Sequence, residues 1–467
     1  MATFSIENFG CRATDADAAA LRRALLASDL AQSGEHAVAD IVVLNTCTVT
    51  AAADSQAREA VRKIHRTNPA ARIVVTGCYA QRAPEEIAAM DGVACVVGNS
   101  HQAEIPGIAL GLVAPSGGAT GDFVSVSQLE DGAMSLARGP AKILTGDILA
   151  QATVQIAPAT LMAGGRTRPI LKIQDGCNNR CSYCVIPFVR GRSRSLPPEV
   201  VVEEAAALVA AGAKEIVLSG INLGSYGRDL TPRAELADVV RRILVETAIE
   251  QLRFSSIEPQ DVTEDFVELV ASSHRIAQHF HIPLQSGCDR ILRAMHRWYR
   301  TGHYAERIHL IRRRLPDAAI GADVIVGFPG ETDADFRATG DFIESLSFTY
   351  LHVFSFSERP GTKAADLGDA VPPQTIRERA RALRDLAQKK SAAFRASQAG
   401  RTLRALTLAR GRDDWTEALT GNYLKARIDG RHPANEWREI CVTSAADQVP
   451  NSVIPSGARN LSSIGAR

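Results

Sequence analysis

The sequence predicts an α/β fold with an N-terminal doubly wound parallel sheet, a central partial (β/α)6 barrel and a small all-β domain at the C-terminal end. Strand-like and helix-like stretches alternate through the first two parts, and short strands without intervening helices make up the third. The 467 residues are enough for two or three domains, and 45% of them are hydrophobic, as in ordinary globular proteins.

These patterns divide the chain into five segments. We expect an N-terminal domain at 2–110, a linker rich in Gly, Ala and Ser at 111–165, the barrel at 166–397, the all-β domain at 398–446 and a tail at 447–467. The tail has no sustained hydrophobic pattern, so we expect it to be disordered.

Charge and composition exclude several classes of protein. Lys and Arg total 53 against 52 for Asp and Glu, so the formal net charge of +1 gives no overall attraction to nucleic acid or membranes. No run approaches the roughly 18 apolar residues that a membrane helix needs, and the first residues lack the pattern of a secretion signal. We therefore expect a cytoplasmic protein whose nine cysteines include metal ligands rather than a disulfide framework.

Three strand-like runs of the N-terminal domain end in cysteine. They are "FSIENFGC", "DIVVLNTC" and "ARIVVTGC", which end at Cys11, Cys47 and Cys78. Because right-handed crossovers make such strands parallel, their carboxyl ends emerge at one edge of the sheet. A single cysteine of this kind is commonly a small buried hydrophobe. Three in equivalent places indicate a shared ligand site.

The barrel is predicted by six strand-like runs separated by amphipathic stretches. The runs are "PILKIQDGC", "EIVLSGIN", "QLRFSSIEP", "HFHIPLQSG", "AAIGADVIVGFPGE" and "YLHVFSFSERPG". Six consecutive βα units predict a parallel sheet curled into an incomplete barrel, with function at the carboxyl ends of its strands. Each polar cluster in this segment follows a strand.

The first of these strands leads into "GCNNRCSYCVIPFVRG", which holds Cys177, Cys181 and Cys184 in a CxxxCxxC spacing. Structural zinc would require a fourth ligand, and no second cysteine pair follows. A 4Fe-4S cluster normally has four thiolate ligands, so three cysteines leave one iron open to a small molecule. This spacing on the loop after a first barrel strand is typical of radical S-adenosylmethionine enzymes. The alternative is three incidental thiols on a loop.

The longer stretch "CNNRCSYCVIPFVRGRSRS" and the three-part organisation resemble the methylthiotransferases. That family combines an N-terminal cluster-binding domain, a radical S-adenosylmethionine barrel and a C-terminal TRAM domain. The resemblance implies a second, auxiliary 4Fe-4S cluster on Cys11, Cys47 and Cys78. The chain departs from the family at Thr14, where Asn is frequent. This departure bears on a contact near the auxiliary cluster rather than on its ligands.

The resemblance also implies a reaction that uses two molecules of S-adenosylmethionine per turnover. One methylates a sulfide associated with the auxiliary cluster. The other gives a 5′-deoxyadenosyl radical that removes hydrogen from the substrate carbon, so sulfur and a methyl group are inserted there. We expect Tyr183, Gly220, Glu258 and Gln285, one in the cluster loop and three at strand ends, to bind this cofactor. Ordinary loop and helix-cap roles are the alternative for each.

Three branches of the family share this architecture. Phrases such as "LSGINLGSYG" and "HVFSFSERPGT" look most like the branch that modifies N6-threonylcarbamoyladenosine at position 37 of tRNA. The alternatives are the branch acting on N6-isopentenyladenosine at the same position and the branch acting on an aspartate of a ribosomal protein. A different class, a non-catalytic iron-sulfur or zinc RNA-binding protein, would not explain six βα units with polar strand ends.

A tRNA substrate requires contacts to the anticodon loop. Between Thr375 and Arg412, eleven Lys and Arg residues accompany two acidic residues, which indicates either a phosphate-binding stripe or a solvated helix face. The candidate substrate contacts are Arg190, Arg192, Tyr423 and Lys425. The family implies an electron donor such as flavodoxin or ferredoxin and a sulfur source. We expect no membrane partner, and the oligomeric state stays open.

Several other thiols and imidazoles have plainer interpretations. We expect Cys95, Cys288 and Cys441 to be structural. His279 and His281 alternate along one strand without a nearby carboxylate in the sequence, so we expect them to pack in the core.

Overall fold

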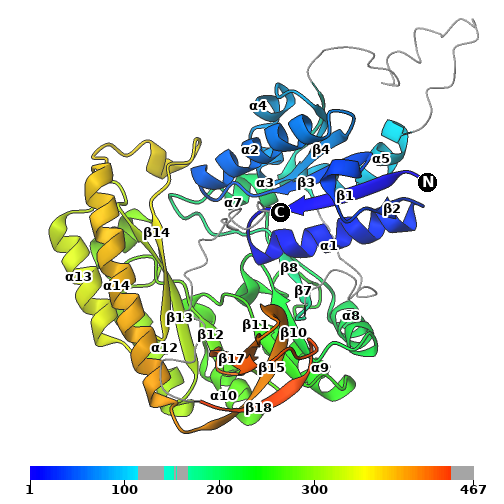
Figure 1. The fold of residues 1–467 in the computed structure, drawn as a ribbon. Coiled ribbons are helices and arrows are strands. Elements are labelled where there is room, and N and C mark those ends of the chain that lie inside the picture. The colour runs from blue at the N-terminus through cyan, green and yellow to red at the C-terminus, as the bar shows by residue number, and fades with distance from the viewer. Residues whose placement is uncertain (114–140, 152–153, 155–166, 443–467) are drawn as a thin grey trace, which may run out of the picture. The chain divides into compact units, whose positions relative to one another are not determined.

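A computed structural model describes residues 1–113, 141–151, 154 and 167–442 (Figure 1). The predicted tail at 447–467 and most of the predicted linker lie outside the described residues. The chain forms two compact units. The first comprises residues 1–48, 52–151 and 188–190, and the second comprises residues 49–51, 152–187 and 191–467.

The first unit is built on a six-stranded parallel sheet with the order β2-β1-β3-β4-β5-β6. Its strands are β1 Thr3–Asn8, β2 Ala31–Gln32, β3 Ile41–Thr46, β4 Arg72–Gly77, β5 Val93–Gly98 and β6 Lys142–Leu144. The runs "IVVL" and "IVV" in β3 and β4 are buried on both faces, as strands inside a parallel sheet must be. The predicted parallel sheet is confirmed.

Helices cover both faces of this sheet. The helices and 3-10 turns of the unit are α1 Arg12–Ala27, η1 His36–Val38, α2 Ala51–Thr67, α3 Cys78–Arg82, α4 Pro84–Ala88, η2 Asn99–Glu104, α5 Ile105–Val113 and η3 Ile148–Ala150. Leu21 and Leu25 of α1 pack with Ile105 of α5 in one apolar cluster. A second cluster, on alternate residues of β3 and β4, takes in α2, α3 and α4. The sheet is therefore doubly wound, as predicted.

The second unit contains six parallel strands in chain order. They are β7 Ile170–Lys172, β10 Glu215–Ser219, β11 Gln251–Phe254, β12 His279–His281, β13 Ala319–Val326 and β14 Tyr350–Ser355. The first three strands form one sheet and the last three form another. Two parallel bridges, Leu252 with Ile276 and Ser256 with His281, connect the two sheets. This arrangement is the predicted partial barrel. A short antiparallel pair, β8 Gln174–Asp175 and β9 Arg194–Ser195, flanks the cysteine loop.

Helices alternate with the barrel strands along the chain. They are α7 Ile186–Arg190, α8 Pro198–Ala210, α9 Leu236–Glu246, α10 Glu264–Ser272, α11 Asp289–Ala294, α12 Thr301–Arg314, α13 Asp333–Ser345 and α14 Pro373–Ser397, with 3-10 turns η4 Leu223–Ser225, η5 Pro259–Asp261 and η6 Lys363–Ala365. Figure 1 shows the long α14 alongside α13 and β14. In the part of the chain that the structure describes, no helix combines the length and the hydrophobicity needed to cross a bilayer.

The C-terminal part of the second unit is an antiparallel sheet. Its strands, in the order β17-β16-β15-β18, are β15 Thr402–Arg412, β16 Trp415–Thr420, β17 Lys425–Asp429 and β18 Trp437–Cys441. The predicted all-β part is confirmed. Arg253 of β11, which is fully buried, ties this sheet to the barrel. Its guanidinium pairs with Glu215 (2.8 Å) and donates to the carbonyl oxygens of Thr420 and Gly421 (3.1 Å each).

Replacement of this arginine should destabilise the second unit strongly. Arg253→Met leaves the buried Glu215 carboxylate without its closest cation, and breaking a buried ion pair costs about 3–5 kcal/mol. We expect the free energy of unfolding, measured by urea denaturation, to fall by that amount. Arg241→Met, which removes an exposed arginine paired with Asp265, is the matched control and should change it by less than about 1 kcal/mol. Equal effects of the two substitutions would contradict this account.

Candidate functional site

The three N-terminal cysteines lie at one edge of the six-stranded sheet. Cys11 follows β1, Cys47 follows β3, and Cys78 begins α3 directly after β4. Gly10 has φ of +114°, and a Cβ there would collide with Cys47, so the loops that carry Cys11 and Cys47 are in close contact. Cys47 and Cys78 are buried and Cys11 is exposed. The convergence expected from the strand pattern is present.

Polar groups of the first unit surround these thiols. Asn99 donates its side-chain N–H to the Cys78 sulfur (3.6 Å). Arg190 pairs with Asp17 of α1 (2.7 Å), and each of the two side chains is only 2% exposed. Burial raises the pKa of Cys78, while the nearby Arg190 guanidinium opposes this rise and the Cys11 thiol adds to it. Arg190 therefore belongs to the surroundings of the N-terminal thiols, and its predicted contact with substrate phosphate gains no support from this placement.

The second set of cysteines lies on the loop between β8 and α7. Gly176 has φ of +71°, and a Cβ there would collide with the Arg192 carbonyl oxygen. Gln174 donates to the Gly176 carbonyl oxygen (2.7 Å), and the Cys177 N–H donates to the carbonyl of Gly191 (3.1 Å). The start of the cysteine loop is thereby held against the segment that follows it.

Each thiol of this loop has a hydrogen-bond donor or a buried environment suited to a bound thiolate. Arg297 donates to the Cys181 sulfur (3.1 Å), and the Asn222 side-chain N–H lies 4.0 Å from the sulfur of Cys177. Burial raises the pKa of Cys177 to about 11 and that of Cys184 to about 12. These thiols therefore stay protonated until a metal displaces the proton, as metal-ligating cysteines do on loading.

Neither set of cysteines is closed around a single ion. Among the described residues, one group of three or more His, Cys, Asp or Glu side chains has all its donor atoms within 4.8 Å of one another, and it consists of His281, Asp323 and His352. Neither set of three cysteines is that close together. Tetrahedral zinc at about 2.3 Å from each sulfur would bring thiolates to roughly 3.8 Å from one another. The wider spacing of both cysteine sets fits a polynuclear cluster better.

Three predicted cofactor residues follow successive barrel strands. Gly220 follows β10, and a Cβ there would press on the Gln174 side-chain oxygen (2.8 Å). Glu258 follows β11 and forms a short ion pair with Arg297. Gln285 follows β12 with φ of +64°, a left-handed conformation that is uncommon for a non-glycine residue. The strand ends thus carry a polar rim beside the cysteine loop, while the assignment of each residue to the cofactor stays a prediction.

The comparisons with known proteins agree with this geometry. Residues 171–343 match the Radical SAM superfamily, and residues 3–98 match a family described as Uncharacterized protein family UPF0004. The threonylcarbamoyladenosine tRNA methylthiotransferase MtaB of Aquifex aeolicus is 36% identical over 91% of this chain and 96% of its own length. The chain belongs to the radical S-adenosylmethionine methylthiotransferase family. It is an enzyme of the radical class, and the family implies S-adenosylmethionine and a 4Fe-4S cluster.

Relatives with another substrate are also similar to this methylthiotransferase. A tRNA-2-methylthio-N(6)-dimethylallyladenosine synthase of Syntrophobacter fumaroxidans is 34% identical over 79% of this chain and 76% of its own length. A solved structure of the radical S-adenosylmethionine methyltransferase TsrM from Kitasatospora setae covers 78% of this chain and 77% of that one, with a TM-score of 0.55 and 17% identity. The TsrM likeness supports the fold alone.

Residues that the sequence interpretation missed complete the site of the methylthiotransferase. Arg297, in "MHRWYR", contacts both Cys181 and Glu258, and Trp298 beside it is 59% exposed. Tyr299 fixes this segment by donating its hydroxyl to the carbonyl of Leu284 (2.9 Å). An arginine shortly after a helix was the sequence signal for Arg297, and it is a weak one.

Substitution of Arg297 should weaken both stability and cluster loading. Arg297→Met leaves the largely buried Glu258 carboxylate without its cation, so we expect the free energy of unfolding to fall by about 3 kcal/mol. Iron content per chain should fall as well, because the donor to the Cys181 sulfur is lost. Urea denaturation and iron analysis measure the two effects. Arg293→Met, on the exposed face of α11, is the control, and an iron content in Arg297→Met equal to that of the control would contradict this role.

Thr14, where this methylthiotransferase departs from the family pattern, has a local structural role. It is buried in the first turn of α1, and its hydroxyl donates to the carbonyl oxygen of Cys11 (2.7 Å). The threonine thereby holds the turn that carries the first thiol.

The remaining predicted site residues have mixed surroundings. Tyr183 is partly buried against an apolar cluster that includes Met295 and Phe328. The ring of Tyr423 stacks on His279 with centroids 4.2 Å apart. Lys425 lies 3.9 Å from the buried Glu417 carboxylate and is mostly buried. Arg192 is exposed. Of these side chains, Arg192 is the one that the structure presents to solvent for a substrate phosphate.

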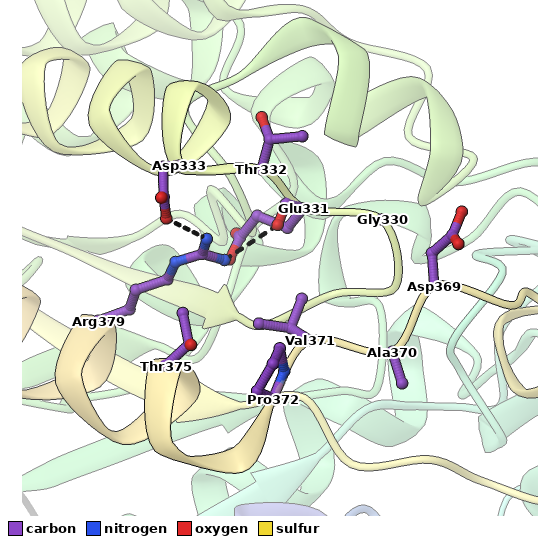
Figure 2. Close-up of a pocket in the computed structure, with 10 residues that line it drawn as sticks. All are labelled: Gly330, Glu331, Thr332, Asp333, Asp369, Ala370, Val371, Pro372, Thr375 and Arg379. Carbon is purple, nitrogen blue, oxygen red and sulfur yellow. Dashed lines mark hydrogen bonds and ion pairs between the residues drawn. The ribbon is translucent and has the colours of Figure 1, made fainter.

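A surface pocket of about 490 Å³ lies between the loop after β13 and the start of α14 (Figure 2). Its one cationic lining residue, Arg379, points toward Glu331 and Asp333 and pairs with each at 2.7 Å (Figure 2). None of the predicted site residues lines it. Because its arginine is already neutralised, the pocket is unsuited to anions such as RNA phosphates.

Proposed function

We propose that this methylthiotransferase converts N6-threonylcarbamoyladenosine at position 37 of tRNA to its 2-methylthio derivative. The observation that carries the proposal is the 36% identity, over 91% of this chain, to a relative whose name specifies threonylcarbamoyladenosine. Dimethylallyladenosine synthases match up to 95% of the chain, at a lower identity of 31–34%. Modification of isopentenyladenosine is therefore the second candidate.

The cysteine loop and the strand ends divide the work of the barrel. When bound, the cluster and S-adenosylmethionine supply the radical that removes hydrogen from the substrate carbon. Cys177, Cys181 and Cys184 would hold the cluster through their thiolates. Glu258 and Gln285 would orient the cofactor at the carboxyl ends of β11 and β12. Burial raises the pKa of Glu258, and Arg297 opposes this rise.

A second 4Fe-4S cluster belongs on Cys11, Cys47 and Cys78. The support is their position at one sheet edge, a spacing too wide for a single ion, and Asn99 as a donor to sulfur. Two molecules of S-adenosylmethionine would be consumed per turnover. An electron donor such as flavodoxin or ferredoxin and a source of sulfur complete the reaction.

The tRNA is expected to approach exposed cationic and aromatic side chains. Trp298 and Arg293 are both exposed beside the segment that holds Arg297. Exposed aromatic rings bind unstacked bases, and arginines bind phosphates. Several arginines of the predicted basic stripe pair with carboxylates instead, among them Arg379 with Glu331. The stripe is thus a weaker candidate than the composition indicated.

Nucleoside mass spectrometry tests the proposal. The chain is expressed in cells that lack their own methylthiotransferases, and digested tRNA is analysed. We expect 2-methylthio-N6-threonylcarbamoyladenosine. Appearance of the isopentenyl product alone would assign the enzyme to the other tRNA branch, and absence of any methylthio nucleoside in an anaerobically competent host would direct attention to a ribosomal protein as substrate.

A further inference from the structure

Five polar side chains lie together on β12, β13 and β14, and we call them the barrel cluster. They are His279, His281, Asp323, Tyr350 and His352. The residues that alternate with them, such as Phe280, Val324 and Leu351, belong to the apolar core that packs against the helices. Because successive side chains of a strand point to opposite faces, the barrel cluster faces the inside of the barrel. Branched apolar residues usually fill that space.

Hydrogen bonds connect the members of the barrel cluster. One oxygen of Asp323 lies 3.1 Å from His281 Nε2 and 3.1 Å from His352 Nδ1. The Tyr350 hydroxyl lies 3.0 Å from His281 Nδ1 and 2.8 Å from His279 Nε2. The carboxylate that the sequence interpretation did not find for His281 thus comes from the next strand. Although burial acts against it, the two imidazoles hold the pKa of Asp323 well below its ordinary value, so the carboxylate stays ionised.

Exposure increases from one end of the barrel cluster to the other. The His281 side chain is 7% exposed, that of Asp323 is 25% exposed and that of His352 is 37% exposed. Asp323 is held through its side chain by the two histidines and through its backbone carbonyl, which accepts the N–H of Gln285 (2.8 Å). His352 is therefore the accessible end of the cluster, and Asp323 fixes its ring through Nδ1. Among the described residues, the structure gives its Nε2 no partner.

The barrel cluster adjoins the strand ends assigned to the cofactor. Gln285 forms a parallel bridge with Val324 of β13, the residue directly after Asp323. Burial raises the pKa of Glu258, and the charges of Asp261 and Asp323 add to this rise, so Asp323 and Glu258 share one electrostatic environment. Asp323, and His352 paired with it, thus lie level with the strand ends where the cofactor is expected to bind.

We propose that His352, held by Asp323, hydrogen-bonds the polar acyl substituent on N6 of the substrate adenosine and makes the enzyme selective for it. This proposal rests on the proposed function and names the residue that reads its substrate. A threonylcarbamoyl group carries a hydroxyl that can donate to Nε2 of an imidazole whose Nδ1–H is given to Asp323. Its carboxylate and carbonyl oxygens can accept from the protonated form of the same ring. An isopentenyl group has none of these, and a site built to hydrogen-bond a ligand discriminates against an analogue that lacks the partner.

The test compares two anticodon stem-loop RNAs that differ only in the N6 substituent, threonylcarbamoyl or isopentenyl. Holoenzyme with reconstituted clusters is assayed for methylthiolation, and KM and kcat are measured for each RNA. His352→Leu should raise KM for the threonylcarbamoyl RNA by about 10- to 100-fold, as expected for a lost hydrogen bond to a charged group. It should also reduce the ratio of kcat/KM between the two RNAs. His352→Gln, which keeps a donor, should restore part of the loss.

His309→Leu, an exposed histidine of α12, is the matched control and should leave both RNAs unaffected. Iron content and melting temperature verify that each variant is folded and loaded. A His352→Leu enzyme with an unchanged kcat/KM ratio would overturn the proposal. A non-iron metal that is present in the wild type and lost in His352→Leu would overturn it too, because three donor atoms of the cluster lie within 4.8 Å. Wild-type enzyme that modifies only the isopentenyl RNA, or neither RNA, would instead show that the proposed function has failed.

Discussion

Cys181→Ala should abolish reductive cleavage of S-adenosylmethionine. Cys181 is the proposed cluster ligand whose sulfur accepts a hydrogen bond from Arg297 (3.1 Å), and its loss would leave two thiolates where three are needed. Because the cofactor carries the radical chemistry, we expect 5′-deoxyadenosine formation to fall by about three orders of magnitude or more. The measurement is chromatography of 5′-deoxyadenosine after incubation with dithionite under anaerobic conditions.

Cys441→Ala is the control for this experiment. Cys441 is exposed at the end of β18, outside both cysteine sets, so this variant should cleave the cofactor at the wild-type rate. Iron analysis adds a second readout, since Cys181→Ala should lose about four iron atoms per chain. Normal cleavage by Cys181→Ala would exclude Cys181 as a ligand of the proposed 4Fe-4S cluster on the cysteine loop.

Cys47→Ala should separate the role of the proposed auxiliary cluster from that of the cluster proposed on the cysteine loop. Cys47 is buried at the end of β3, in the first unit, while the radical cysteines lie in the second. We expect the variant to form 5′-deoxyadenosine and to transfer no methylthio group to tRNA, a loss of about a thousandfold or more in product. Mass spectrometry of the tRNA nucleosides, with 5′-deoxyadenosine measured in the same reaction, gives both quantities.

Cys95→Ala is the matched substitution for Cys47→Ala. Cys95 is buried on β5 of the same sheet, and burial raises its pKa to about 11, which fits an inert structural thiol. This variant should keep methylthiolation once it is folded, at a cost in stability. Full methylthiolation by Cys47→Ala would contradict an auxiliary cluster in the mechanism.

The fold could be predicted from the sequence because its local signals agree with one another. The runs "DIVVLNTC" and "ARIVVTGC" are apolar throughout, as parallel strands buried on both faces must be, and each ends in the cysteine that marks its carboxyl end. The order of strands in the barrel follows their order in the chain, so each strand pairs with the next one in the sequence and no pairing between distant strands had to be predicted.

The contacts within the site could not be predicted, because they join distant residues. Arg297 is 116 residues from Cys181, and Arg190 is 173 residues from Asp17. Arginine on a loop indicates an exposed side chain, and only the folded chain shows Arg190 in a buried pair. Tyr423 looked like a base-stacking residue, yet its ring lies on His279 across the boundary between the C-terminal sheet and the barrel strands.

One isotope experiment tests the central claim, that the radical formed in this barrel acts on carbon 2 of threonylcarbamoyladenosine 37. A stem-loop RNA with deuterium at that carbon is incubated with reduced holoenzyme and S-adenosylmethionine. The deuterium content of the 5′-deoxyadenosine is then measured by mass spectrometry. We expect one deuterium in 5′-deoxyadenosine for each methylthio nucleoside formed. Methylthiolated RNA accompanied by 5′-deoxyadenosine without deuterium would contradict the account.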